Sequence, residues 1–79
     1  MSTEVKKFKP YQQRVADESI VLGQKLRDLR IFIDENAEFK NLSVEEQRLL
    51  IRQDFIMSIY LSILNDRIAF FADGAGMPK

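Results

Sequence analysis

The chain has 79 residues, and its 12 Lys and Arg balance 12 Asp and Glu, so the formal net charge is zero. A chain of this length holds one domain at most, and it is short for a monomer that must be stabilised by its own core. The zero net charge argues against a general binder of DNA or RNA. Any binding of phosphate must therefore be local.

The sequence contains no His and no Cys. This excludes disulfide scaffolds, Cys nucleophiles, His-based triads and nearly every zinc site, so we expect neither a metal nor a cofactor. Carboxylate or Lys chemistry remains for catalysis, but it needs a buried pocket that so short a chain can hardly build alone. We therefore expect a binding protein and not an enzyme.

The N-terminal residues and the longest apolar stretch indicate where in the cell the protein is expected. Three lysines in residues 1–9 are followed by no apolar segment, so we expect no secretory signal and a cytoplasmic protein. Residues 55–64 form the longest apolar stretch, which Ser58 and Ser62 interrupt. Because a membrane span needs about 20 apolar residues, we expect no transmembrane segment.

The first helix is expected to follow a flexible basic arm, residues 1–9. Pro10 suits a first helical turn because its φ angle is fixed and it has no N–H to leave unsatisfied. The absence of further proline lets this helix continue to about Glu35, and Asn36 is a plausible stop. A polar connection of about six or seven residues should follow, since that length joins antiparallel helices.

The second helix has the strongest local start signal in the chain. Ser43 can cap the helix while Glu46, three residues on, reaches back to it as in a capping box. The helix should continue to about Phe71 or Ala72, and residues 73–79 should form a flexible tail. The expected fold is thus all-α, a two-helix antiparallel hairpin over residues 10–72.

Apolar positions in both helices alternate in steps of three and four, which is the pattern of a helix-packing seam. The first seam consists of Val15, Ser19, Leu22, Leu26, Leu29 and Ile33. The second consists of Leu50, Asp54, Met57, Leu61, Leu64, Ile68 and Phe71. The two seams can pack against each other in the hairpin.

Further apolar residues lie outside the two seams, and a lone hairpin would leave them exposed. They are Ile20, Val21, Ile31 and Phe32 in the first helix and Leu49, Ile56, Ile59, Tyr60, Ile63 and Phe70 in the second. Exposed apolar surface of this extent usually marks a binding face, and a second copy of the chain is the simplest partner. We expect an obligate homo-oligomer.

Gly23 lies inside the first helix, where glycine costs about 1 kcal/mol relative to Ala. It predicts a close approach to the backbone, more plausibly by another helix than by a ligand.

Three side chains are candidates for ligand binding. Tyr11 lies among several basic residues, which places a flat ring for base stacking beside cations for phosphate. Lys25 and Arg67 are cations next to apolar surface. The alternative for Tyr11 is helix-end packing. The alternative for the two cations is snorkelling or ion pairing with Asp28, Asp54 or Asp66.

Tyr11 and Lys25 are fourteen residues apart, close to four turns, so they share a helix face but lie about 21 Å apart along the axis. One small ligand cannot touch both in one chain. If both bind one compact ligand, they come from two antiparallel subunits.

Four features together resemble a family of small tailed-phage proteins, the anti-CBASS sponges, which share their fold with the Thoeris anti-defence sponges. These features are Pro10-Tyr11-Gln12-Gln13-Arg14-Val15, Lys25 after an apolar cluster, Ser43-x-x-Glu46, and Tyr60-x-x-x-Leu64-x-x-Arg67-Ile68-x-x-Phe71. The resemblance covers Lys9 to Phe71, most of the chain.

The resemblance implies a helical hairpin that assembles as a hexamer, a trimer of dimers, in the cytoplasm of the bacterial host. It implies interfaces that bind cyclic dinucleotides such as 3′,3′-cyclic GMP-AMP, and separate sites for cyclic trinucleotides nearer the threefold axes. In that family a Tyr at the start of the first helix stacks on a base and a Lys further along contacts phosphate, and the matching positions are Tyr11 and Lys25.

Two functions of other classes remain as alternatives. One is a structural or regulatory hairpin oligomer that acts only through protein contacts. The other is a single-stranded nucleic-acid binder that uses the basic arm, which the zero net charge disfavours.

Overall fold

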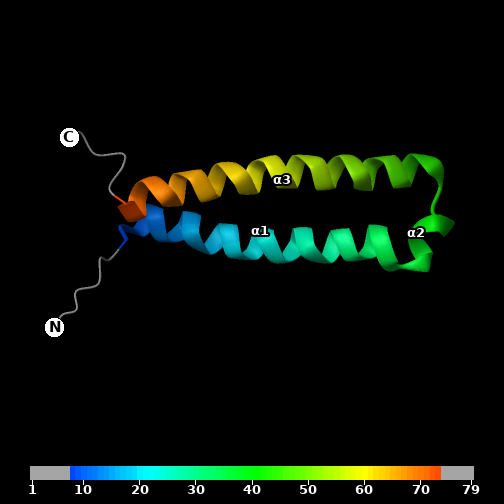
Figure 1. Cartoon of the computed structure of the whole chain (residues 1–79), viewed down its shortest axis with the longest axis horizontal. Helices are drawn as coiled ribbons and strands as arrows, with labels where there is room; N and C mark the ends of the chain where they lie inside the picture. The colour runs from blue at the N-terminus through cyan, green and yellow to red at the C-terminus, as the bar shows by residue number, and fades with distance from the viewer. Residues whose placement is uncertain (1–7, 74–79) are drawn as a thin grey trace.

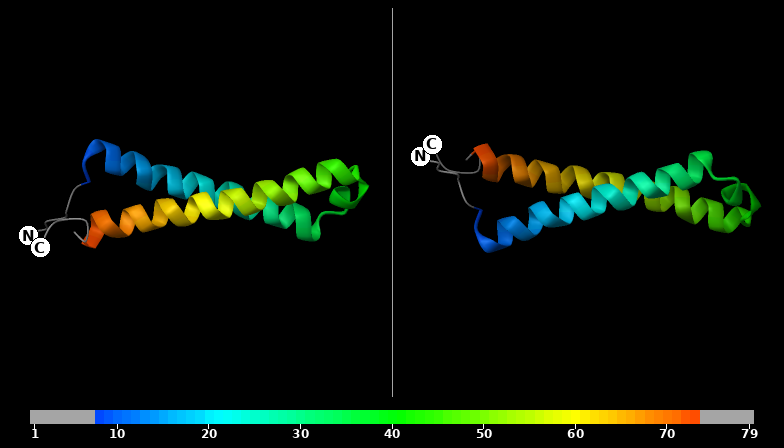
Figure 2. Two further views of the ribbon diagram at one scale, coloured as in Figure 1. Left: turned by 90° about the horizontal axis from the view of Figure 1, so that it is seen from above. Right: turned by 90° about the horizontal axis from the view of Figure 1, so that it is seen from below.

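The computed structural model describes residues 8–73, which form three helices and no strand. The helices are α1 (Pro10–Glu35), α2 (Ala37–Asn41) and α3 (Val44–Asp73). The long helices α1 and α3 lie side by side in opposite directions, with α2 at the turn between them (Figure 1). Seen from above and below, α1 and α3 cross near their middle (Figure 2). The predicted all-helical hairpin is confirmed, but its connection is a short helix and not an irregular loop.

Asn36 explains why the connection became helical. Its backbone N–H donates to the carbonyl of Phe32 at 3.2 Å, which closes the last turn of α1. Its side-chain oxygen accepts from the backbone N–H of Glu38 at 2.8 Å, which caps the start of α2. One residue therefore ends one helix and begins the next, as Asn commonly does at an N-cap.

Both long helices begin with a side-chain cap. At the start of α1, the backbone N–H of Lys9 donates to the side-chain carbonyl of Gln12 at 2.9 Å. At the start of α3, the backbone N–H of Glu46 donates to the hydroxyl of Ser43 at 3.1 Å. The helix start predicted at Pro10 and the predicted Ser43 cap are confirmed.

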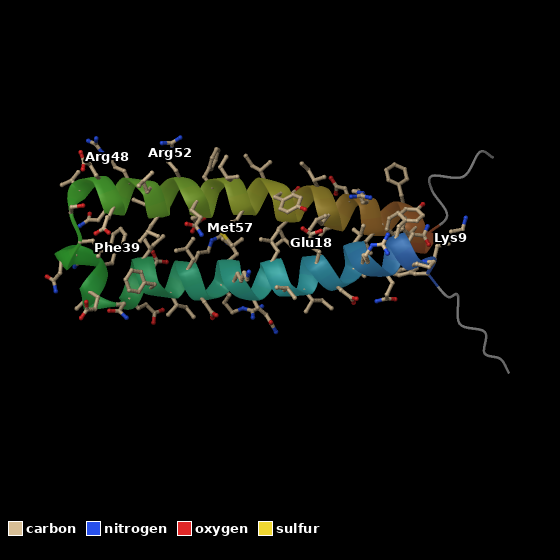
Figure 3. All side chains as sticks on the ribbon, turned by 180° about the vertical axis from the view of Figure 1, so that it is seen from behind. Lys9, Glu18, Phe39, Arg48, Arg52 and Met57 are labelled. Carbon is tan, nitrogen blue, oxygen red and sulfur yellow. The ribbon has the colours of Figure 1, made fainter. Side chains whose placement is uncertain are left out.

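The core of the hairpin is the contact between the two predicted seams, at which every position is buried or half-buried. Val15, Leu26 and Leu64 are buried, and Leu64 has no exposed surface. Figure 3 shows the seam residue Met57 between the two helices, whereas Arg48 and Arg52 project away from α1. The seam prediction is therefore confirmed.

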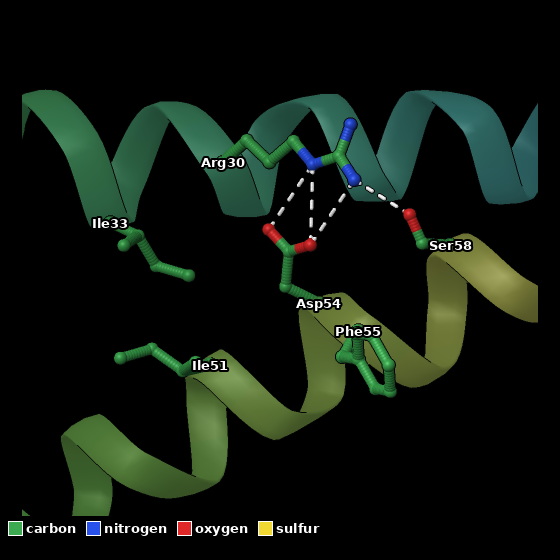
Figure 4. Close-up of a pocket in the computed structure, with 6 residues that line it drawn as sticks. All are labelled: Arg30, Ile33, Ile51, Asp54, Phe55 and Ser58. Carbon is green, nitrogen blue, oxygen red and sulfur yellow. Dashed lines mark hydrogen bonds and ion pairs between the residues drawn. The ribbon is translucent and has the colours of Figure 1, made fainter.

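The polar seam residue Asp54 is paired with Arg30 (Figure 4). The Nε of Arg30 donates to both carboxylate oxygens of Asp54 at 3.2 and 3.3 Å, and its Nη2 donates to Ser58 at 2.6 Å. The pair borders an open groove of about 320 Å³, which Ser58 and the apolar side chains of Ile33, Ile51 and Phe55 also line. A carboxylate at a seam position is stabilised here because a guanidinium from the other helix satisfies it.

Outside the seams, the apolar residues of α3 are exposed as predicted. Ile20, Val21 and Ile31 of α1 are exposed as well. The expectation for Phe32 is wrong, because its ring is half-buried and packs edge to face on Phe39 of α2, with 6.2 Å between the ring centroids. The short helix thus covers one apolar residue that a loop would leave open.

The exposed surface of α3 also bears on the membrane. Within residues 8–73, the segment Val44–Ala72 is long and apolar enough to cross a membrane by length and composition. This differs from the expectation drawn from residues 55–64. The mean hydropathy of a long helix can be high even when polar residues lie along one of its sides. A core helix of a soluble protein meets the same criterion, so the finding by itself does not place the chain in a membrane.

A substitution at Gly23 tests how closely α3 packs against the backbone of α1. A Cβ at this position would meet Cδ2 of Leu61 at 3.9 Å, an ordinary van der Waals distance. We expect Gly23→Ala to stabilise the protein by up to about 1 kcal/mol, because Ala has the higher helix propensity and fits without a clash. Denaturant unfolding at equal chain concentration measures this. A loss of stability would mean that another molecule approaches the backbone there.

Candidate functional site

Glu18 of α1 and Tyr60 of α3 mark one broad face of the hairpin, because the hydroxyl of Tyr60 donates to the carboxylate of Glu18 across the two helices. Residues at steps of three, four or seven from these two lie on the same side, since seven residues make about two turns. We call this side the Tyr60 face. It carries Tyr11, Glu18 and Lys25 from α1 and Leu49, Ile56, Tyr60, Ile63, Arg67 and Phe70 from α3.

All three side chains predicted to bind a ligand therefore lie on one face. Figure 3 places Glu18, at the centre of the α1 part of this face, between the two helices. Tyr11, Lys25 and Arg67 are each exposed. All three side chains are therefore accessible from the same side of the hairpin.

Tyr11 belongs to an aromatic cluster at the open end of the hairpin. Phe8 and Tyr11 both pack edge to face on Phe71, each with 5.9 Å between ring centroids. The cluster fixes the position of the Tyr11 side chain, which remains 47% exposed. The helix-end packing weighed as an alternative is thus present, and the ring is still accessible for stacking.

The alternative of ion pairing for the two cations is wrong for residues 8–73. The carboxylate of Asp54 is bound by Arg30. Neither Lys25 nor Arg67 forms a salt bridge within the described part of the chain. Both cations are therefore available to an anion from outside the hairpin.

The hairpin does not bring Tyr11 and Lys25 together. Helix α1 is continuous from Pro10 to Glu35, so the fourteen-residue separation is about 21 Å along the helix. Arg67 lies one turn before Phe71, at the same end of the hairpin as Tyr11. One chain thus offers an aromatic ring and a cation at one end, and a second cation well away from them.

The pair Glu18–Tyr60 is the feature that sequence reasoning missed. The hydrogen bond to Glu18 raises the pKa of Tyr60 above its ordinary value of 10.0, and partial desolvation and the charge of Glu18 act in the same direction. Arg67 lowers it, which shows that the guanidinium lies near the phenol. In the sequence Tyr60 stood among the apolar positions outside the seams and at the start of the motif that includes Arg67, but neither pattern indicated its bond to Glu18.

Possible metal ligands and buried polar atoms in residues 8–73 are the other features that bear on a binding site. No group of three or more acidic residues in residues 8–73 is arranged to hold a metal ion. No buried side-chain polar atom in this range lacks a hydrogen-bond partner. The Tyr60 face offers a ligand three kinds of contact: one aromatic ring, two cations and a row of apolar side chains.

A family model described as Sequestin matches residues 9–70, most of the chain. The chain belongs to the Sequestin family. The family name indicates a sequestering function, which confirms the identification of the chain with a sponge family. No curated protein and no solved structure matches the chain.

The raised pKa of Tyr60 in this Sequestin is testable by titration of the phenol absorbance in a Tyr11→Phe background. We expect Glu18→Gln to lower the pKa of Tyr60 and Arg67→Gln to raise it, in line with the physical causes above. Because the folded-state pKa lies above 10.0, the hydrogen bond contributes stability below about pH 10 and loses it as the pH rises through the raised value. Equal titration curves in all three proteins would contradict the pairing.

Proposed function

We propose that this Sequestin is a phage anti-defence sponge. It binds cyclic oligonucleotide messengers, with cyclic dinucleotides such as 3′,3′-cyclic GMP-AMP as the main ligands and cyclic trinucleotides as a second class. Binding is tight and reversible and leaves the ligand uncleaved, so that CBASS effectors in the host cytoplasm are not activated. The observation that carries the proposal is the grouping on one face of exposed Tyr11 with Lys25 and Arg67, two cations that form no salt bridge within residues 8–73.

The chemistry of the ligand fits these residues. A cyclic dinucleotide presents base faces and two phosphates. Tyr11, held in place by Phe71, offers a ring for stacking on a base. Lys25 and Arg67 offer charge-assisted hydrogen bonds to phosphate, which are about twice as strong as neutral ones. With no His or Cys in the chain, few groups could activate water against the phosphodiester.

The proposal includes self-assembly into a hexamer built as a trimer of dimers. Because about 21 Å separates Tyr11 from Lys25 in one chain, one compact ligand can contact both only across two subunits. A second copy would also cover the apolar part of the Tyr60 face, which is exposed in the hairpin. Assembly and ligand binding are therefore parts of one proposal.

An oligomer that acts only through protein contacts is the second candidate, favoured by the same exposed apolar residues. Lys25 and Arg67, which form no salt bridge within residues 8–73, favour the sponge, because a ligand phosphate would supply the anion that each of them lacks there. A salt titration of binding distinguishes a single-stranded nucleic-acid binder from the proposed sponge. A polymer groove gives a steep dependence of affinity on salt concentration, and a two-phosphate site gives a shallow one.

Assembly is tested by light scattering at micromolar concentration without detergent. We expect a mass well above that of one chain, and we expect Ile56→Glu or Ile63→Glu to split or unfold the oligomer by placing a charge in an apolar contact. Gln24→Glu is the matched control, because Gln24 is exposed on α1 away from the Tyr60 face. A stable folded monomer, or a protein that stays in solution only in detergent, would contradict the proposal.

Ligand binding is tested by calorimetric titration with 3′,3′-cyclic GMP-AMP. We expect Tyr11→Ala to cost about 1–3 kcal/mol, roughly 5- to 150-fold in affinity, with a similar loss for Lys25→Ala and an intact oligomer in both. Arg67→Ala should weaken binding too, though it can also disturb Tyr60. Unchanged affinity in all three variants would mean that the binding residues lie elsewhere.

Two further measurements belong to this titration. Mixing the Tyr11→Ala and Lys25→Ala proteins after subunit exchange should restore part of the binding, because the two residues act from different subunits. Ligand recovered after denaturing the complex should be intact on chromatography, and a linear dinucleotide would instead reveal cleavage.

A further inference from the structure

Tyr11 lies in the first turn of α1, where a helix is least stable. The first four backbone N–H groups of a helix have no acceptor within the helix, so this turn tends to fray. Here the backbone N–H of Gln13 donates to the carbonyl of Lys9 at 2.9 Å, and the backbone N–H of Lys9 donates to the side chain of Gln12 at 2.9 Å. These bonds fix the backbone at Tyr11 but leave its side chain free to change rotamer.

Phe71 of α3 restrains the Tyr11 side chain itself. The start of α1 lies beside the end of α3 (Figure 1), and the rings of Tyr11 and Phe71 meet at an interplanar angle of 81° with 5.9 Å between centroids. This is the edge-to-face arrangement that aromatic pairs prefer. Because Phe71 belongs to the other long helix, a change of the Tyr11 rotamer would break a contact between α1 and α3.

Phe8 adds a second ring to the same contact. It packs on Phe71 at an interplanar angle of 71°, also with 5.9 Å between centroids. Phe71 is half-buried, whereas Tyr11 is 47% exposed. An edge-to-face contact occupies one face or one edge of the Tyr11 ring, so at least one face of that ring stays available for stacking on a base.

We propose that Phe71 is a positioning residue for ligand binding. It holds the Tyr11 ring, before any ligand arrives, in the orientation in which that ring stacks on a base. A side chain that is already ordered in the free protein does not have to be ordered by the ligand, which is worth about 2- to 10-fold in affinity. The proposal rests on the proposed function for the role of Tyr11, but the order of the ring in the free protein is independent of any ligand.

A double-mutant cycle tests whether Phe71 acts through Tyr11. We expect Phe71→Leu to weaken the calorimetric binding of 3′,3′-cyclic GMP-AMP about 2- to 10-fold, because leucine keeps apolar volume but removes the ring contact. In a Tyr11→Ala background the same substitution should change the affinity by less than about twofold, since no ring remains to be positioned. Phe71→Tyr keeps an aromatic ring and should keep most of the affinity.

Phe39→Leu is the matched control. Phe39 packs edge to face on Phe32 at the opposite end of the hairpin, with 6.2 Å between the ring centroids. Its substitution removes the same kind of contact but leaves Tyr11 untouched, so we expect the affinity to stay unchanged. Light scattering of both leucine variants checks that neither changes the mass of the assembly.

The order of the Tyr11 ring can also be measured without a ligand. The chain has two Tyr and no Trp, so in Tyr60→Phe protein the near-ultraviolet circular dichroism of tyrosine comes from Tyr11 alone. In that background we expect Phe71→Leu to reduce the tyrosine band and Phe39→Leu to leave it unchanged. A substitution that only lowered the stability of the fold would leave the band of the folded protein intact.

An equal loss of affinity from Phe71→Leu with and without Tyr11 would overturn the proposal, because Phe71 would then act on the ligand or on the assembly directly. An unchanged affinity or an unchanged tyrosine band would overturn it as well. If Phe71→Leu does not fold, Phe8→Leu repeats the cycle from the other ring that packs on Phe71, and the absence of a loss that depends on Tyr11 would again overturn it. A wild-type protein that binds no ligand, together with a tyrosine band that falls in Phe71→Leu, would overturn the proposed function and leave the ordering of Tyr11 by Phe71 standing.

Discussion

A hairpin of two helices can bury only one stripe of each, and the organisation of this protein follows from that limit. The seam buries Val15, Leu26 and Leu64, and its other members remain half-buried because residues 8–73 contain no third long helix to cover them. A core this thin offsets little of the conformational entropy lost on folding. The exposed apolar residues of α3 on the Tyr60 face are therefore a source of stabilisation that the hairpin leaves unused, and it becomes available only when something covers them.

The seam and the helix ends could be predicted because their signals are local. Steps of three and four select the buried stripe of a helix whatever lies opposite, and Ser43 caps a helix start through a bond to its own neighbour. The connection could not be predicted in the same way. Its short helix depends on Asn36 serving two helices at once and on Phe39 packing against Phe32, a contact between residues in different elements.

The same distinction applies to the candidate site. Residue type and periodicity were enough to select Tyr11, Lys25 and Arg67 and to place the first two on one face. They were not enough to decide which carboxylate pairs with which cation, because that depends on the relative shift of α1 and α3. In the folded chain Arg30 reaches Asp54, and Glu18 accepts from Tyr60. Within residues 8–73, Lys25 and Arg67 form no salt bridge, and Arg30 rather than either of them binds Asp54.

Zero net charge and a cationic binding site are compatible because they act at different distances. Beyond about 10 Å at moderate salt, the charges of the chain are screened and sum to nothing, so a long polyanion feels no general attraction. A polymer gains affinity by adding phosphate contacts along its length, and an isolated pair of cations gives it few. On the proposed function, a compact ligand with two phosphates and stacking bases would use the same cations and add the contact with Tyr11. Such a site would select a small cyclic nucleotide over a strand of RNA through the spacing of its contacts, without any group that reads the sequence of bases.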